Sequence, residues 1–141
     1  MTPIDVSEAL TGTELVELAQ YALSRAHSGD DGPWRRSAAV LARQSIEQSM
    51  AEVWALRSPG MADTSIRAQM IALPCYVESA VARRSRWAWA TLSGFCHHRV
   101  YALPPALPTL SSCVDFAAGL AAQTDSIASK QYKMTTRREH D

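Results

Sequence analysis

Residues 33–57 read PWRRSAAVLARQSIEQSMAEVWALR and carry the longest uninterrupted helical pattern in the chain. The apolar side chains of this stretch recur at helical spacing and fall on one stripe, formed by Ala39, Ala42, Ile46, Met50 and Val53. Beside the stripe, Arg43 and Glu47 stand four residues apart, a spacing that favours an ion pair on a helix surface. Proline at the first position and a Ser-Pro-Gly turn at 58–60 predict a helix over 33–57.

Two shorter helices are predicted around that stretch. Thr11 and Glu14 have the spacing of a capping box, so we expect a first helix to start at Thr11 and to stop at Gly29. Another helix begins after Asp63 and continues until Pro74, because proline removes a backbone donor and clashes with the preceding turn.

Two more helices are predicted toward the C-terminus. One starts between Glu78 and Ser85 and stops before Pro104, and the next is capped by Thr109. Neither sustained apolar and polar alternation nor a hairpin turn occurs in the sequence, which therefore predicts an all-α fold of about five helices. The stretch 123–141 is polar, and we expect it to form a frayed tail.

Length and composition indicate one globular domain, which we place at residues 1–122. The chain has 141 residues, of which 47% are hydrophobic, 20% charged and 7% aromatic. Its apolar runs, such as the eight residues from Met70 to Val77, are far shorter than the roughly 20 needed to cross a bilayer. The first residues are acidic and lack the basic segment of a signal peptide. We therefore expect a soluble, cytoplasmic protein with no membrane partner.

The cysteines and histidines do not form a metal-binding pattern. Cys75, Cys96 and Cys113 include no C-x-x-C pair, so the thiols are expected to be free and mostly buried. The adjacent residues of the segment 96–98, Cys-His-His, would point about 100° apart on a helix and so cannot all bind one ion. We expect neither a metal site nor a bound cofactor.

Charge is unevenly distributed, although the net charge is zero. Residues 1–32 carry six acidic residues and one arginine, a balance of −5, and residues 33–100 carry nine arginines and four acidic residues, a balance of +5. Two interpretations are open: the acidic segment packs on the basic one, or the basic segment forms a surface for phosphates. The bias of 12 arginines to two lysines also fits a GC-rich genome.

The helix predicted before Pro104 contains the residues with the most functional chemistry. Its apolar stripe consists of Trp89, Leu92, Cys96, Val100 and Leu103. Arg99 falls within the same arc and must reach solvent or pair with a carboxylate, because a buried unpaired guanidinium is costly. We expect a structural ion pair with Glu47. The alternative is that Arg99 recognises a ligand.

The opposite side of this helix is the predicted interface. It combines small, aromatic and imidazole side chains, namely Trp87, Ala90, Gly94, His97, His98 and Tyr101. Small residues beside larger rings form a shallow groove that admits either a second helix or a ligand. Packing against a second helix, and hence a homodimer, is the favoured interpretation.

Taken together, the Arg- and Glu-bearing helix at 34–47, the Ser-Ile-Arg-Ala-Gln segment at 65–69 and the Cys-His-His-x-x-Tyr segment at 96–101 resemble the HEPN superfamily. The similarity is greatest to a short, actinobacterial-type branch with a Cys-His-His element and covers residues 34–120. The resemblance implies an antiparallel up-and-down helical bundle that commonly dimerises. It also implies a role in bacterial conflict, as a toxin, an antitoxin partner or an RNA-processing protein.

Catalytic members of that superfamily place a histidine four to six residues after an arginine, and this chain departs from the pattern. Arg86 precedes His97 by eleven residues, and the local order is His97, His98, Arg99. The sequence therefore favours a non-catalytic module that binds a protein or RNA partner. The alternative is a metal-independent endoribonuclease toxin that uses His97, His98 and Arg99, because RNA cleavage needs an imidazole and a phosphate-holding cation.

Overall fold

The computed structural model describes residues 10–30, 32–96 and 105–140, and every regular element in these ranges is helical. This confirms the all-α prediction and the number of α-helices. The elements are α1 (Gly12–His27), α2 (Trp34–Arg57), η1 (Pro59–Asp63), α3 (Ile66–Ala72), η2 (Leu73–Cys75), α4 (Ser79–Cys96) and α5 (Leu107–Arg138). Among the described residues, no helix is both long and apolar enough to cross a membrane.

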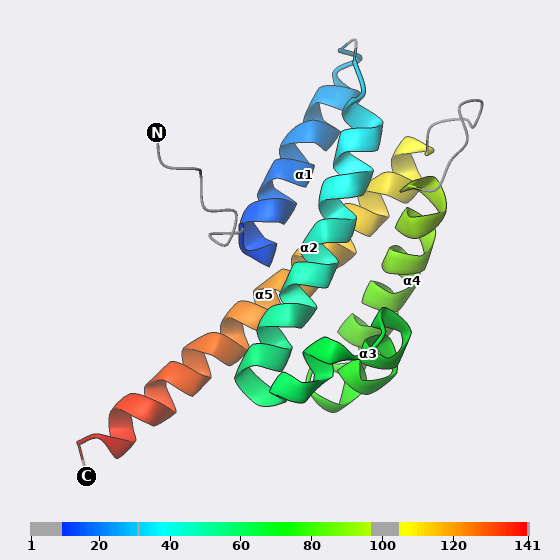
Figure 1. The fold of residues 1–141 in the computed structure, drawn as a ribbon. Coiled ribbons are helices and arrows are strands. Elements are labelled where there is room, and N and C mark those ends of the chain that lie inside the picture. The colour runs from blue at the N-terminus through cyan, green and yellow to red at the C-terminus, as the bar shows by residue number, and fades with distance from the viewer. Residues whose placement is uncertain (1–9, 31, 97–104, 141) are drawn as a thin grey trace, which may run out of the picture.

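Helix α2 occupies the middle of the fold and packs against α1, α4 and α5 (Figure 1). The predicted stripe of α2 is confirmed, because all five of its residues are buried. Helices α4 and α5 complete the core, in which the largest fully buried apolar side chains are Trp54, Ile46, Met50, Leu73, Leu92, Leu110 and Leu120. Burial of this apolar surface is the main source of stability for the bundle.

The start of α1 is fixed by local hydrogen bonds and by close packing on α2. The predicted capping box is present, with Glu14 N donating to Thr11 Oγ1 and Thr11 N donating to Glu14 Oε1, each over 3.1 Å. Ser45 Oγ on α2 donates to Gly12 O over 2.7 Å. A Cβ at Gly12 would collide with the Ser49 hydroxyl, so this close approach of the two helices requires glycine.

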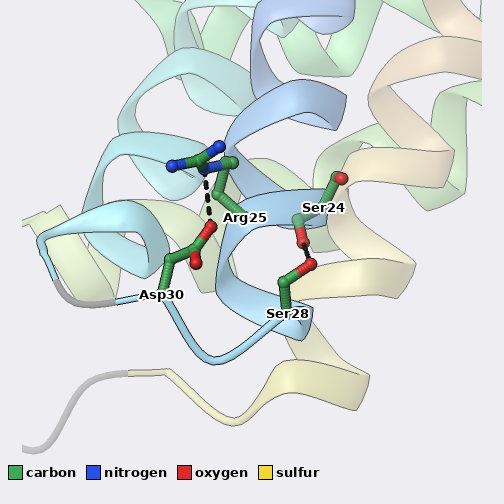
Figure 2. A network of polar contacts seen from close by, with 4 residues as sticks. All are labelled: Ser24, Arg25, Ser28 and Asp30. Carbon is green, nitrogen blue, oxygen red and sulfur yellow. Dashed lines mark hydrogen bonds and ion pairs between the residues drawn. The ribbon is translucent and has the colours of Figure 1, made fainter.

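The connection between α1 and α2 is a turn stabilised by charged and polar contacts (Figure 2). Gly29 has a φ of 73°, in the left-handed region that favours glycine, and it ends α1 where the sequence predicts. Arg25 Nε lies 2.7 Å from Asp30 Oδ2, and Ser28 Oγ donates to Ser24 O over 3.0 Å. These contacts lie within the first 30 residues and do not involve the basic segment.

A buried polar link fastens α3 to α2. Trp54 Nε1 on α2 donates to Gln69 Oε1 on α3 over 2.9 Å, and Gln69 Nε2 donates to Thr64 O over 3.0 Å. Both side chains are buried, so these bonds satisfy groups that water cannot reach. The short helix α3, which ends before Pro74 as predicted, thereby gains a fixed position beside α4.

The structure corrects two predictions for the C-terminal region. Helix α5 begins at Leu107 with Pro108 in its first turn, so Thr109 is inside the helix and does not cap it. The helix continues to Arg138 through the stretch predicted to fray, and Thr124 and Ile127 are buried. Neither glycine nor proline interrupts residues 120–138, and a polar composition alone does not end a helix. In Figure 1 the C-terminal end of α5 projects beyond the other helices.

Candidate functional site

Helices α3 and α4 form a strongly basic surface. The 7 residues of α3 include Arg67, and the 18 residues of α4 include Arg83, Arg84 and Arg86. Neither helix contains Asp or Glu. All four arginines are exposed. Within the described ranges the ion pairs are Arg25 to Asp30 and Arg43 to Glu47, so none of these four takes part in one. Four positive charges without carboxylates nearby on their own helices attract anions.

The ion pairs of the structure can be compared with the uneven distribution of charge between the acidic segment 1–32 and the basic segment 33–100. Neither ion pair among the described residues joins the acidic segment 1–32 to the basic segment 33–100. Glu14 of α1 instead accepts a hydrogen bond from Thr11 N and caps its own helix. Helix α1 of the acidic segment packs on α2 of the basic segment, as the first interpretation expects, while the arginines of α3 and α4 stay exposed, as the second expects, so both interpretations remain open.

A groove of about 340 Å³ lies between α3 and α4. It is lined by Arg67, Met70, Ile71, Arg86, Trp89 and Ala90. Ile71 is 71% exposed, which leaves a large aliphatic side chain in water at the edge of the groove. The groove thus combines apolar walls with a guanidinium group on each of the two helices, a lining that suits a ligand with both apolar and anionic parts.

Trp89 is held in the groove by residues of α2. Its Nε1 donates to Glu47 Oε1 over 3.0 Å, and Arg43 Nε lies 3.4 Å from the same oxygen. The Arg43 guanidinium also lies 5.8 Å from the centre of the Trp89 ring, within the range of a cation–π contact. Arg43 therefore offsets the charge of Glu47, and the carboxylate fixes the indole.

Trp87 lies on the exposed side of α4, as the sequence predicts, and is 46% exposed. Its ring packs edge-on against Phe116 of α5, with ring centres 5.7 Å apart. The Arg84 guanidinium lies 5.7 Å from the centre of the same Phe116 ring. These contacts orient one aromatic and one cationic group side by side on the basic surface.

Gly94 also lies on the exposed side of α4. A Cβ at Gly94 would meet no heavy atom within 4 Å among the described residues. Ala90, one turn earlier, is exposed as well. No described residue therefore contacts a Cβ at Gly94, in the small-residue part of the predicted interface.

The remaining predicted site residues lie outside the described ranges. These are His97, His98, Arg99 and Tyr101. The expected ion pair between Arg99 and Glu47 and the alternative catalytic set therefore stay predictions. Among the described residues, no group of three or more His, Cys, Asp or Glu side chains could hold a metal ion.

The cysteines correct one expectation. All three are free, but only Cys113 is buried, whereas Cys75 is exposed and Cys96 is half-buried. Burial raises the pKa of Cys113 to about 11, so this thiol stays protonated and unreactive at neutral pH.

A larger hollow of about 600 Å³ lies beside the turn between α1 and α2. Its arginines are partly used within the fold, since Arg35 Nη1 donates to Pro105 O over 3.3 Å. Asp30 also lines it and places a negative charge at its wall. For these reasons the groove between α3 and α4 is the better candidate for an anionic ligand.

Sequence reasoning missed the α3 side of the site. Arg67 and Ile71 stand on a different helix from Trp89, and only the packing of α3 beside α4 brings them together. The signal that could have found them is the absence of Asp and Glu from both helices.

Comparisons with known protein families, with curated proteins and with solved structures find no match to this chain.

Proposed function

We propose that this chain is a non-catalytic, HEPN-like module that binds single-stranded RNA through the surface formed by α3 and α4. The observation that carries the proposal is the set of four exposed arginines on two helices without a single Asp or Glu. Neutralising phosphates with arginine releases counterions and supplies most of the affinity in such complexes. The fold it rests on is an antiparallel up-and-down bundle of the HEPN type.

The exposed aromatic ring supports a single-stranded ligand. Trp87 stands beside the arginines of α4 and is 46% exposed, so one face of its ring is available to a base. Unpaired bases stack on such rings, whereas the bases of a duplex are already stacked on each other. A basic groove with an aromatic side chain is the usual surface for single strands.

Binding is favoured over cleavage by the order of residues in the segment 97–99. An RNA-cleaving site needs an imidazole and a phosphate-holding cation that converge on one ribose phosphate. In catalytic HEPN proteins the arginine comes before the histidine, whereas here both histidines precede Arg99. We therefore expect the protein to hold RNA without cutting it.

The proposal includes a homodimer formed through the C-terminal half of α4. Gly94 supports it, because a small exposed residue lets a second helix approach closely. Contact there would leave Arg83, Trp87 and the groove of α4 open for RNA. The setting that fits such a module is bacterial defence or a toxin and antitoxin pair.

Fluorescence anisotropy with a labelled single-stranded RNA tests the function. The purified protein should bind at 50 mM salt and lose affinity steeply as salt rises to 200 mM, because phosphate contacts dominate. The RNA should be recovered intact after the titration. No binding at 50 mM salt would contradict the function, and RNA cleavage abolished by His97→Ala or His98→Ala would replace it with the ribonuclease alternative.

A further inference from the structure

We propose that the groove between α3 and α4 is a subsite for one unpaired base of the bound RNA, an inference that rests on the RNA-binding function proposed above. A base has apolar faces and is flanked along the chain by phosphates. The groove has features that match both parts of such a ligand. Its walls are apolar, and an arginine stands on each of the two helices that form it.

The apolar walls come from three side chains that the fold holds in place. Ile71 is 71% exposed at the edge of the groove, and Met70 beside it is buried, so the wall of α3 is anchored in the core. Ala90 contributes only a methyl group on the α4 side, which leaves the space open. An exposed isoleucine costs free energy in water, and a stacked base would cover it.

Trp89 gives the groove a fixed aromatic surface. Its Nε1 donates to Glu47 over 3.0 Å, so the polar atom of the indole is directed toward α2 and is already used. What the ring offers a ligand is therefore its apolar surface. Contact with that surface is stacking, and it depends little on which base is bound.

The charges and the size of the groove select the ligand. Arg67 and Arg86 line it from opposite helices, and neither forms an ion pair among the described residues. They are placed to hold the phosphates on either side of the base. A volume of about 340 Å³ is near the lower end for ligand sites and accommodates one small ring system.

A variant that fills the groove without changing its charge tests the subsite. Ala90→Phe places a ring in the groove and keeps all four arginines, and Ala122→Phe on α5 is the matched control because Ala122 is also exposed. Ala90→Phe should weaken binding of single-stranded RNA about 10-fold or more, the range for loss of one stacked base. Its salt dependence should equal that of the wild type. The control should bind normally.

A ribose-phosphate oligomer of the same length without bases is the second probe. The wild type should bind it more weakly than RNA, and Ala90→Phe should cause no further loss on this probe. If Ala90→Phe binds RNA as well as Ala122→Phe does, the base subsite is wrong although RNA binding stands. If both variants and the wild type fail to bind RNA at 50 mM salt, the RNA-binding function itself is wrong.

Discussion

The Nε1 of Trp89 lies 3.0 Å from Oε1 of Glu47 and donates a hydrogen bond to it, which joins α4 to α2 across the side of the candidate site. The sequence singles out Glu47 as the ion-pair partner of Arg99, a pairing that lies outside the described residues. In the structure Glu47 accepts a hydrogen bond from the Trp89 indole and forms an ion pair with the Arg43 guanidinium. Glu47 therefore positions an aromatic ring of the groove from a neighbouring helix.

Loss of this carboxylate should loosen the site. Glu47→Ala leaves the Trp89 N–H without its acceptor and Arg43 without its ion-pair partner, and we expect the free energy of unfolding to fall by about 1–3 kcal/mol. Glu47→Gln retains an oxygen acceptor for the indole and should lose less. Urea unfolding of the three proteins measures the difference. Equal stability of wild type and Glu47→Ala would show that the contact does not hold the helices together.

Gly12 should be intolerant of even a methyl group, although alanine is the better helix former. Gly12→Ala forces the start of α1 away from Ser49, and we expect a loss of about 1–3 kcal/mol from this overpacking. Ser49 Oγ is buried and has no hydrogen-bond partner among the described residues, so Ser49→Ala alone should be neutral or slightly stabilising. The double variant should recover part of the loss. A stabilised Gly12→Ala protein would contradict the close approach of α1 and α2.

Stability should depend on the ionisation of Glu52. Burial, and then repulsion by Asp125 and Glu14, raises its pKa above the ordinary 4.5, although a hydrogen bond from Gly12 N opposes the shift. The folded protein therefore holds this proton more tightly than the unfolded chain. The resulting stability is present below pH 4.5 and is lost as the pH rises through the folded pKa.

Glu52→Gln isolates this contribution. The variant keeps an oxygen that accepts from Gly12 N and removes the charge, so its Tm should exceed that of the wild type at pH 7. The two melting temperatures should converge near pH 4. Thermal unfolding followed by circular dichroism across this range tests the sign. A variant less stable than the wild type at pH 7 would show that the charged carboxylate stabilises the fold.

How far the fold could be predicted depends on whether its determinants are local. The capping box of Thr11 and Glu14, the limits of α2 and the end of α3 before Pro74 follow from neighbouring residues, and the structure confirms them. The length of α5 could not be predicted in this way. Its residues after Ala121 are mostly polar, and Ile127 is buried as part of the hydrophobic core.

The candidate site was predicted on one helix only. Trp87 and Gly94 were placed correctly on the exposed side of α4, because helical spacing alone determines the side on which a residue lies. The groove depends on α3 lying beside α4, and the buried bond from Trp54 to Gln69 ties α3 to α2. Such contacts between distant residues have no signature in the spacing of a single helix.

Oligomeric state tests the dimer part of the proposed function. Light scattering at micromolar concentration should give about twice the 15.4 kDa chain mass. Gly94→Leu should shift the protein to a monomer without lowering its Tm, since a Cβ there meets no heavy atom within 4 Å among the described residues. Gly119→Leu on α5 is the control, because a Cβ at Gly119 also meets no heavy atom within 4 Å among the described residues and Gly119 stands on a different helix. A dimer that survives Gly94→Leu would place the interface elsewhere.

The salt dependence of RNA binding tests the central claim, that the arginines of α3 and α4 hold phosphates. The measurement is the slope of log Kd against the logarithm of the salt concentration for two double variants. The groove variant carries Arg67→Ala and Arg86→Ala, and the control variant carries Arg36→Ala and Arg138→Ala. Both double variants remove two exposed positive charges, but only the first removes them from the groove. We predict that the slope of the groove variant falls by about 1.4, since each phosphate contact of a single strand contributes about 0.7. Equal slopes for the two variants would contradict the claim.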